Sequence, residues 1–152
     1  MAHINEKYDF VISVYIVFGD KVLLVNHPRY NMWVPMGGHI ELDEDPEQAI
    51  FREIKEETGL EVEILSDKPT ISSPGTKFIF TPNFVDVHVA NPPHKHIALT
   101  YFARATTNKH VLSDEHSDIN WLSEADLEKP EYNLSEAVKF YSRAAIKSTQ
   151  NR

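Results

Sequence analysis

Apolar residues along the chain follow two different periods, and the changes of period mark the expected strands and helices. Segments rich in β-branched and aromatic residues predict strands, whereas apolar residues at helical spacing predict helices. The predicted strands cover 10–18, 21–26, 61–65, 84–90, 96–105 and 119–122, and the predicted helices cover 46–58 and about 134–147. Gly19-Asp20 is expected to form a tight turn, and 66–82 to form turns and an irregular hairpin. The pattern alone indicates an α+β protein without a linker or a repeat.

The helix predicted at 46–58 has a clear beginning and a clear end. Asp45 is a favoured N-cap, Pro46 suits the first helical position, and Gln48 completes a capping box with Asp45. Gly59 suits the left-handed residue that ends many helices. At about 100° per residue, one face carries Ala49, Glu53, Glu56 and Glu57, with Arg52 at its edge. The roughly opposite face carries Ile50, Phe51, Ile54 and Thr58 and is expected to pack against a sheet.

The acidic face of this helix requires a balancing positive charge. Residues 41–57 carry eight carboxylates against only Arg52 and Lys55. Carboxylates this close repel one another, and the repulsion grows as the local dielectric falls. A bound divalent cation would balance them, and oxygen-only ligands suit Mg²⁺ or Mn²⁺ rather than zinc. The alternative is a solvated acidic helix with an Arg52–Glu56 pair, which leaves Gly37-Gly38 unexplained.

The stretch from Gly38 to Leu60 resembles a complete Nudix box, the signature of hydrolases that act on nucleoside diphosphates linked to another group. Gly38, Glu44 and the run Arg52-Glu53-Ile54-Lys55-Glu56-Glu57-Thr58-Gly59-Leu60 stand at the spacing of that signature. The resemblance covers these 23 residues directly, and the flanking pattern extends it to most of the chain. It implies an α/β fold, a Nudix-type α/β/α sandwich with a mixed β-sheet between helices, and a single Nudix hydrolase domain over 1–152.

The resemblance also implies roles for individual residues. Glu53, Glu56 and Glu57 are expected to bind the metal, with the Gly38 carbonyl as a further ligand. Arg52 is expected to orient and neutralise the carboxylates. Glu44 supports Arg52 or the loop, or is an ordinary exposed acid. The general base is Glu53 or an acid in a later loop, of which Glu115 is the leading candidate ahead of Asp114 and His116.

Candidate substrate contacts lie outside the box. His27 and Arg29 follow the second predicted strand and are placed to reach phosphate, whereas Trp33, Tyr30 and Phe84 are candidates for stacking on a base. Surface charge and ordinary core packing are the competing interpretations of these residues. Met36 departs from the family's more common Pro-Gly-Gly, although the two following glycines preserve the backbone freedom that the loop needs.

Three histidines form a loose cluster in the second half of the chain. They are His88, His94 and His96. His94 and His96 are two positions apart, and alternate positions on a strand share a face. No third ligand with convincing spacing accompanies His94 and His96, so phosphate contact, by His96 above all, or a wet strand edge is favoured over a zinc site.

Composition narrows the function classes. The chain has 152 residues and a net charge of −8, which argues against a general nucleic-acid binder. It contains no cysteine, which excludes disulfides and thiol catalysis and fits a cytoplasmic location. The polar residues 1–9 do not form a signal peptide, and the apolar run 10–18 is too short to cross a membrane. The sequence does not distinguish a monomer from a homodimer.

These observations predict a Mg²⁺-dependent pyrophosphohydrolase, with Mn²⁺ as the alternative ion and a nucleoside triphosphate, normal or oxidised, as the favoured substrate. Other candidates are dinucleoside polyphosphates, capped RNA ends, and ADP-ribose or nucleotide sugars. Ser73-Pro74-Gly75 resembles a motif of ADP-ribose pyrophosphatases and is also an ordinary turn. The competing classes are a non-catalytic Nudix-fold nucleotide sensor, which would more often lack one of the glutamates, and a structural interaction domain.

Overall fold

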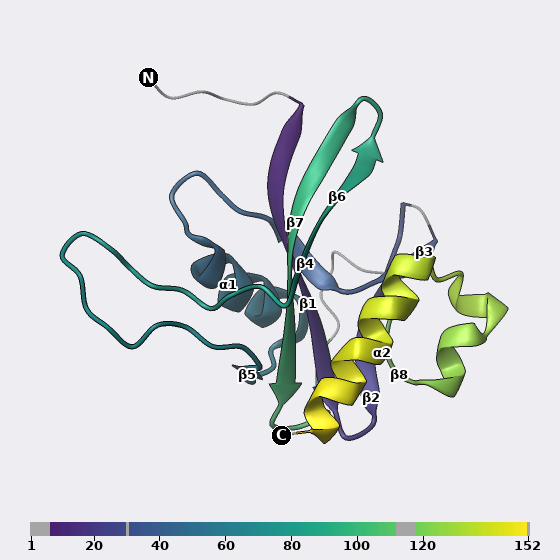
Figure 1. The fold of residues 1–152 in the computed structure, drawn as a ribbon. Helices are drawn as coiled ribbons and strands as arrows, with labels where there is room; N and C mark the ends of the chain where they lie inside the picture. The colour runs from purple at the N-terminus through teal and green to yellow at the C-terminus, as the bar shows by residue number, and fades with distance from the viewer. Residues whose placement is uncertain (1–6, 30, 112–117, 152) are drawn as a thin grey trace.

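The computed structural model describes residues 7–29, 31–111 and 118–151, which form one mixed sheet and several helices (Figure 1). The elements follow in the order β1 (Tyr8–Phe18), β2 (Lys21–His27), β3 (Met32–Val34), β4 (Met36–His39), α1 (Pro46–Thr58), β5 (Val62–Ile64), β6 (Phe84–Asn91), β7 (His94–Ala105), β8 (Asp118–Ser123), the 3-10 helices Ala125–Glu128 and Pro130–Tyr132, and α2 (Glu136–Gln150).

Strand β1 lies at the centre of the sheet. It pairs in parallel with β7 from Tyr8 to Val17, and antiparallel with two different strands on its other side. The end of β1 nearer the N-terminus pairs with β4, whereas its last residues pair with β2. The main strand order is β3-β2-β1-β7-β5, while β6 pairs with β7 and β8 pairs with β2. The predicted mixed sheet is therefore confirmed.

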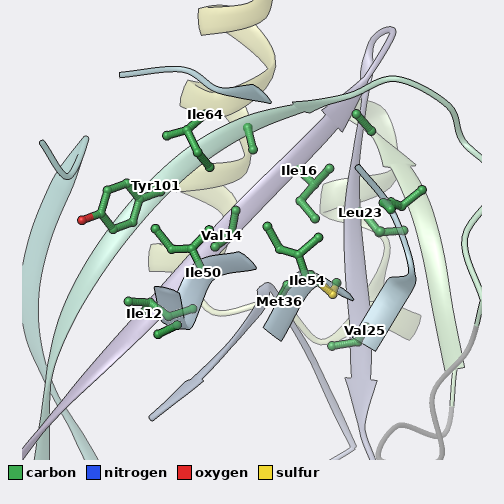
Figure 2. Packing of buried hydrophobic residues seen from close by; sticks show 14 residues of the cluster. Ile12, Val14, Ile16, Leu23, Val25, Met36, Ile50, Ile54, Ile64 and Tyr101 are labelled. Carbon is green, nitrogen blue, oxygen red and sulfur yellow. The ribbon is translucent and has the colours of Figure 1, made fainter. Parts of the chain in front are cut away.

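The two long helices cover opposite faces of this sheet (Figure 1). Side chains alternate along a strand, so Ile12, Val14 and Ile16 of β1 face α1, while Tyr15 and Val17 face α2. Figure 2 shows Ile50 and Ile54 of α1 among the β1 side chains and Met36 of β4. On the other face, Ala145 and Ile146 of α2 pack in a second cluster with Phe102 and Leu122. This arrangement is the expected α/β/α sandwich.

Two strands and one side chain differ from expectation. The short strands β3 and β4 were not predicted, and β4 runs through Gly37 and Gly38, which have low strand propensity. Phe51 is 44% exposed, so its predicted packing against the sheet is wrong. Ala49, Glu53 and Glu57 are buried instead, because α1 lies with its acidic side against β4. The segment 66–82 forms one isolated bridge, Ser73 to Thr76, around an ordinary turn at Pro74-Gly75.

Candidate active site

Helix α1 is fixed at both ends by the capping residues that the sequence predicts. The Gln48 N–H donates to Asp45 Oδ1 at 3.0 Å, and the Asp45 N–H donates to Gln48 Oε1 at 2.9 Å. At the other end, Gly59 has a left-handed φ of 68°, and its N–H donates to the Lys55 carbonyl. Hydrogen-bonded end groups stabilise the helix. The glutamates of α1 therefore project from a helix that is capped at both ends.

The glycines of β4 allow two of these glutamates to lie against the strand. A Cβ on Gly38 would stand 2.3 Å from Glu53 Oε1, so only hydrogen fits there. A Cβ on Gly37 would stand 2.1 Å from the Ile12 carbonyl oxygen of β1. The Gly37 N–H also donates to Glu57 Oε2 at 3.4 Å. Gly37-Gly38 therefore brings a strand backbone into direct contact with the Glu53 and Glu57 carboxylates.

Arg52 connects the acidic residues to one another. Its Nε and Nη2 donate to the two carboxylate oxygens of Glu44 at 2.9 and 2.5 Å, a bidentate geometry that favours strong pairing. Its Nη1 donates to Glu53 Oε1 at 2.9 Å and to Glu56 Oε2 at 3.4 Å, and its Nη2 also donates to the His39 carbonyl. Glu44 retains only 10% side-chain exposure, so it supports Arg52 and is not an ordinary surface acid.

Burial gives the carboxylates unusual electrostatics. Glu53 and Glu57 are 8% and 3% exposed. Burial, together with the nearby charges of Glu57 and Glu56, raises the pKa of Glu53 to about 7, although Arg52 opposes the shift. In contrast, hydrogen bonding from Arg52 lowers the pKa of Glu44. Since one guanidinium is shared among several acids, this group of oxygen donors has capacity for a further cation.

An open cleft of about 420 Å³ lies beside these residues, and it contains most of the predicted site. The cleft is lined by His27, Val34, Pro35, Gly37, Gly38, His39, Glu41, Arg52, Glu53, Glu56 and Glu57. The three box glutamates therefore face one space. A larger hollow of about 660 Å³ along α2 shares no residue with the cleft. His39 and Glu41 were not predicted, although their positions one and three residues after Gly38 could have suggested them.

Not every predicted site residue lines the cleft. Trp33 is 7% exposed and packs edge-on against Tyr132 with ring centroids 5.0 Å apart, which places it in the core and not on an open stacking surface. Phe84 is 37% exposed and contacts Phe102 and other aromatic rings near α2. Arg29 is exposed, and its backbone N–H donates to His27 Nδ1. The candidates Tyr30, Asp114, Glu115 and His116 lie outside the described residues.

His96 belongs to a separate group, which we call the histidine cluster and which comprises Asp9, His39, His88, His94 and His96. The His96 ring centroid lies 5.1, 5.3 and 5.6 Å from those of His39, His88 and His94. Burial, and then the neighbouring imidazoles, hold the pKa of His96 below its ordinary value. Asp9 supplies the third donor that the local spacing did not reveal, since it comes from a strand far away in the sequence.

Comparison with known proteins agrees with this geometry. The model of the NUDIX domain family matches residues 7–144. The structure of a NUDIX-family hydrolase from Clostridium perfringens superposes with a TM-score of 0.80 at 32% identity, and the match covers 95% of this chain and 98% of that one. The chain therefore belongs to the Nudix hydrolase family, whose members are enzymes that act on small nucleotide substrates and generally use a divalent metal.

Curated relatives match smaller parts of the chain. An uncharacterised Nudix hydrolase of Bacillus subtilis, YvcI, is 30% identical over 109 residues, which are 72% of this chain and 62% of that protein. The m7GpppN-mRNA hydrolase NUDT17 of Xenopus laevis is 53% identical over 51 residues, which are 30% of this chain and 17% of that protein. Thus the chain spans less than two thirds of these relatives' lengths. In the part of the chain that the structure describes, no helix is long and apolar enough to cross a membrane.

Proposed function

We propose that this protein is a Mg²⁺-dependent hydrolase that splits a diphosphate linkage in a small nucleotide, with a nucleoside triphosphate, normal or oxidised, as the favoured substrate. The observation that carries the proposal is the position of Glu53, Glu56 and Glu57, which project from one capped helix into one cleft beside the Gly37-Gly38 backbone. All of these donors are oxygens, which is the ligand chemistry that Mg²⁺ and Mn²⁺ prefer.

The contacts of Arg52 support the fit of a cation at this position. Arg52 Nη1 stands between Glu53 Oε1 and Glu56 Oε2, where it supplies positive charge to both carboxylates. Glu53, Glu56 and Glu57, together with the Gly38 carbonyl, would hold the ion. When bound, Mg²⁺ would balance charge on phosphate oxygens and lower the pKa of a bound water.

The chain's own residues provide the remaining parts of the reaction. Glu53 is suited to accept the proton of an attacking water, because its carboxylate lines the cleft and is held there by Arg52. Arg52 keeps Glu53 in place through the 2.9 Å bond, and Glu44 keeps Arg52 in place through two bonds. Glu115 stays the second candidate for the base.

The size and charge of the cleft favour a small, metal-bound substrate. A volume of about 420 Å³ is within the range of small-molecule sites. Arg52 is the only arginine or lysine in the described lining of the cleft, and it already pairs with three glutamates. A bound metal ion is therefore needed to offset the negative charge of a polyphosphate. Some relatives, including NudC of Vibrio atlanticus, are named as hydrolases of capped RNA, although they match only short segments of this chain. Capped RNA is therefore the second candidate substrate.

A nucleotide panel tests both the reaction and the substrate. The panel contains nucleoside triphosphates, ADP-ribose, a nucleotide sugar, a dinucleoside tetraphosphate and NAD-capped RNA, each incubated with Mg²⁺, with Mn²⁺ or with chelator. Products are identified by anion-exchange chromatography, and ¹⁸O-labelled water identifies the attacked phosphorus. We expect metal-dependent release of pyrophosphate from a triphosphate. Faster cleavage of another member would refute the triphosphate preference, and no cleavage of any member with either metal would refute the hydrolase.

A further inference from the structure

We propose that Asp9, His94 and His96 form a second metal site, which binds Zn²⁺ or a similar transition-metal ion and is separate from the carboxylate cleft. One potential ligand atom of each residue lies within 4.8 Å of those of the other two. Asp9 Oδ2 stands 2.7 Å from His94 Nε2, so these two potential ligand atoms are already within hydrogen-bond distance. The proposal does not depend on the reaction proposed above.

The sheet itself brings these three residues together. Asp9 and His96 are register partners on the parallel strands β1 and β7, and His94 precedes His96 by two positions, which puts both histidines on one face. By the same alternation, Asp9 lies on the same face of the sheet as Tyr15 of β1, and His96 lies on the same face as Phe102 of β7. Tyr15 and Phe102 both belong to the second core cluster, so Asp9 and His96 lie on the face that α2 covers. Helix α1 with its glutamates packs against the other face. The two groups of donors therefore lie on opposite faces of the sheet.

His39 is placed to supply a fourth ligand. Its Nε2 stands 3.5 Å from Asp9 Oδ2, and its ring centroid is 5.1 Å from that of His96. A small rotation of an exposed imidazole would bring it toward the other donors, because its side chain is 59% exposed. The backbone carbonyl of His39 accepts from Arg52. Residue 39 thus touches both sites, with its backbone at the carboxylate cleft and its side chain at the histidine cluster.

The donor set selects the class of ion. Two or three imidazoles with one carboxylate suit Zn²⁺ in four-coordinate geometry, whereas Mg²⁺ prefers six oxygens. Solvent can deliver the ion, since the side chains of Asp9 and His94 are 46% and 29% exposed. His88 is not among the three residues whose ligand atoms lie within 4.8 Å of one another, and its Nδ1 is 2.8 Å from Asp86 Oδ1. It offers a matched control, being a histidine of the same cluster with a different partner.

The experiment measures metal binding and not turnover. Chelator-treated protein is titrated with Zn²⁺ by calorimetry in excess Mg²⁺, and Co²⁺ is used as an optical probe of coordination. The variants are Asp9→Asn, His94→Gln, the control His88→Gln, and Glu57→Gln, which alters the carboxylate cleft. Far-UV circular dichroism and thermal unfolding without zinc establish that each variant is folded, and two separate ligand variants keep the test valid if one fails to fold.

We expect one equivalent of Zn²⁺ to persist in the wild type, His88→Gln and Glu57→Gln, with the absorption of four-coordinate Co²⁺. Mutating a residue that only hydrogen-bonds to a metal ligand typically lowers metal affinity by about 10–100-fold. Removing a ligand itself, as in Asp9→Asn and His94→Gln, should therefore weaken Zn²⁺ binding by at least about 100-fold. Unchanged affinity in both ligand variants, or loss of the equivalent in Glu57→Gln, would overturn the second site. Failure of the proposed hydrolysis would instead appear in the nucleotide panel, with zinc binding intact.

Discussion

Replacing Gly38 with alanine should separate catalysis from stability at this site. The added Cβ would stand 2.3 Å from Glu53 Oε1, whereas real Cβ atoms essentially never come closer than 3.0 Å, so the carboxylate must retreat by about 0.7 Å. The obstructing atoms are the end of a flexible side chain, and Gly38 has no positive φ that would strain an alanine. The protein should therefore remain folded with Glu53 displaced.

The expected magnitude follows from that displacement. A misplacement near 1 Å can cost about 100-fold in rate, which corresponds to about 2.7 kcal/mol of transition-state stabilisation. We therefore expect kcat/KM of Gly38→Ala to fall by about 10-fold to 100-fold. The assay is initial-rate hydrolysis of the preferred member of the nucleotide panel at saturating Mg²⁺, together with thermal unfolding of the same samples.

Gly37→Ala is the matched control, because its clash is of a different kind. The obstructing atom is the Ile12 carbonyl oxygen, a backbone atom of the central strand, at 2.1 Å, and Gly37 has a φ of 156°. Here the sheet must move, and we expect a loss of about 1–3 kcal/mol in the free energy of unfolding. Wild-type kcat/KM in Gly38→Ala, or a loss of stability as large as that of Gly37→Ala, would refute the reasoning.

Further predictions concern the acidic residues. Glu56→Gln and Glu57→Gln should each lower turnover by roughly two orders of magnitude or more with the fold intact; near-normal turnover of both with Mg²⁺ would contradict their roles. Arg52→Lys should lower kcat/KM by about 10–100-fold, because an ammonium cannot replace the bidentate pair with Glu44; equal activity under the same assay would show that the fork geometry is dispensable. The pKa of Glu53 is raised from 4.5 to about 7, so the folded state binds the extra proton between these values, and this group makes the metal-free protein less stable as pH rises from about 4.5 to 7. Chemical unfolding across that window in chelator should show this slope in the wild type but not in Glu53→Gln, and Mg²⁺ should reduce it; identical slopes in both proteins would exclude Glu53 as the titrating group.

Local signals account for the parts of the fold that the sequence predicted well. Helix α1 begins and ends where expected, because Asp45, Gln48 and Gly59 act through contacts within a few residues. The observed strands begin two residues earlier than the predicted strands 10–18 and 96–105, at Tyr8 and His94. The added residues are mostly polar, so the apolar pattern did not include them, and they join the sheet through strand pairing and the Asp9–His94 side-chain contact.

Long-range contacts explain what the sequence did not reveal. Strand β4 contains two glycines that have low strand propensity, and it forms through pairing with β1, with Glu53 and Glu57 of the later helix α1 lying against those glycines. Likewise, Asp9 and His94 are 85 positions apart and meet through the parallel pairing of β1 with β7. Parallel pairing leaves no short turn signal in the sequence, so spacing around His94 and His96 could not show a third donor.

The central claim is that the glutamates of α1 hold a divalent cation beside the Gly37-Gly38 backbone. Anomalous diffraction from crystals soaked in Mn²⁺ tests it most directly, with Glu57→Gln crystals as the control. The account predicts a manganese peak within coordination distance of the Glu53, Glu56 and Glu57 carboxylates that disappears or weakens strongly in the variant. An empty cleft at saturating Mn²⁺, with the three side chains still facing it, would contradict the account.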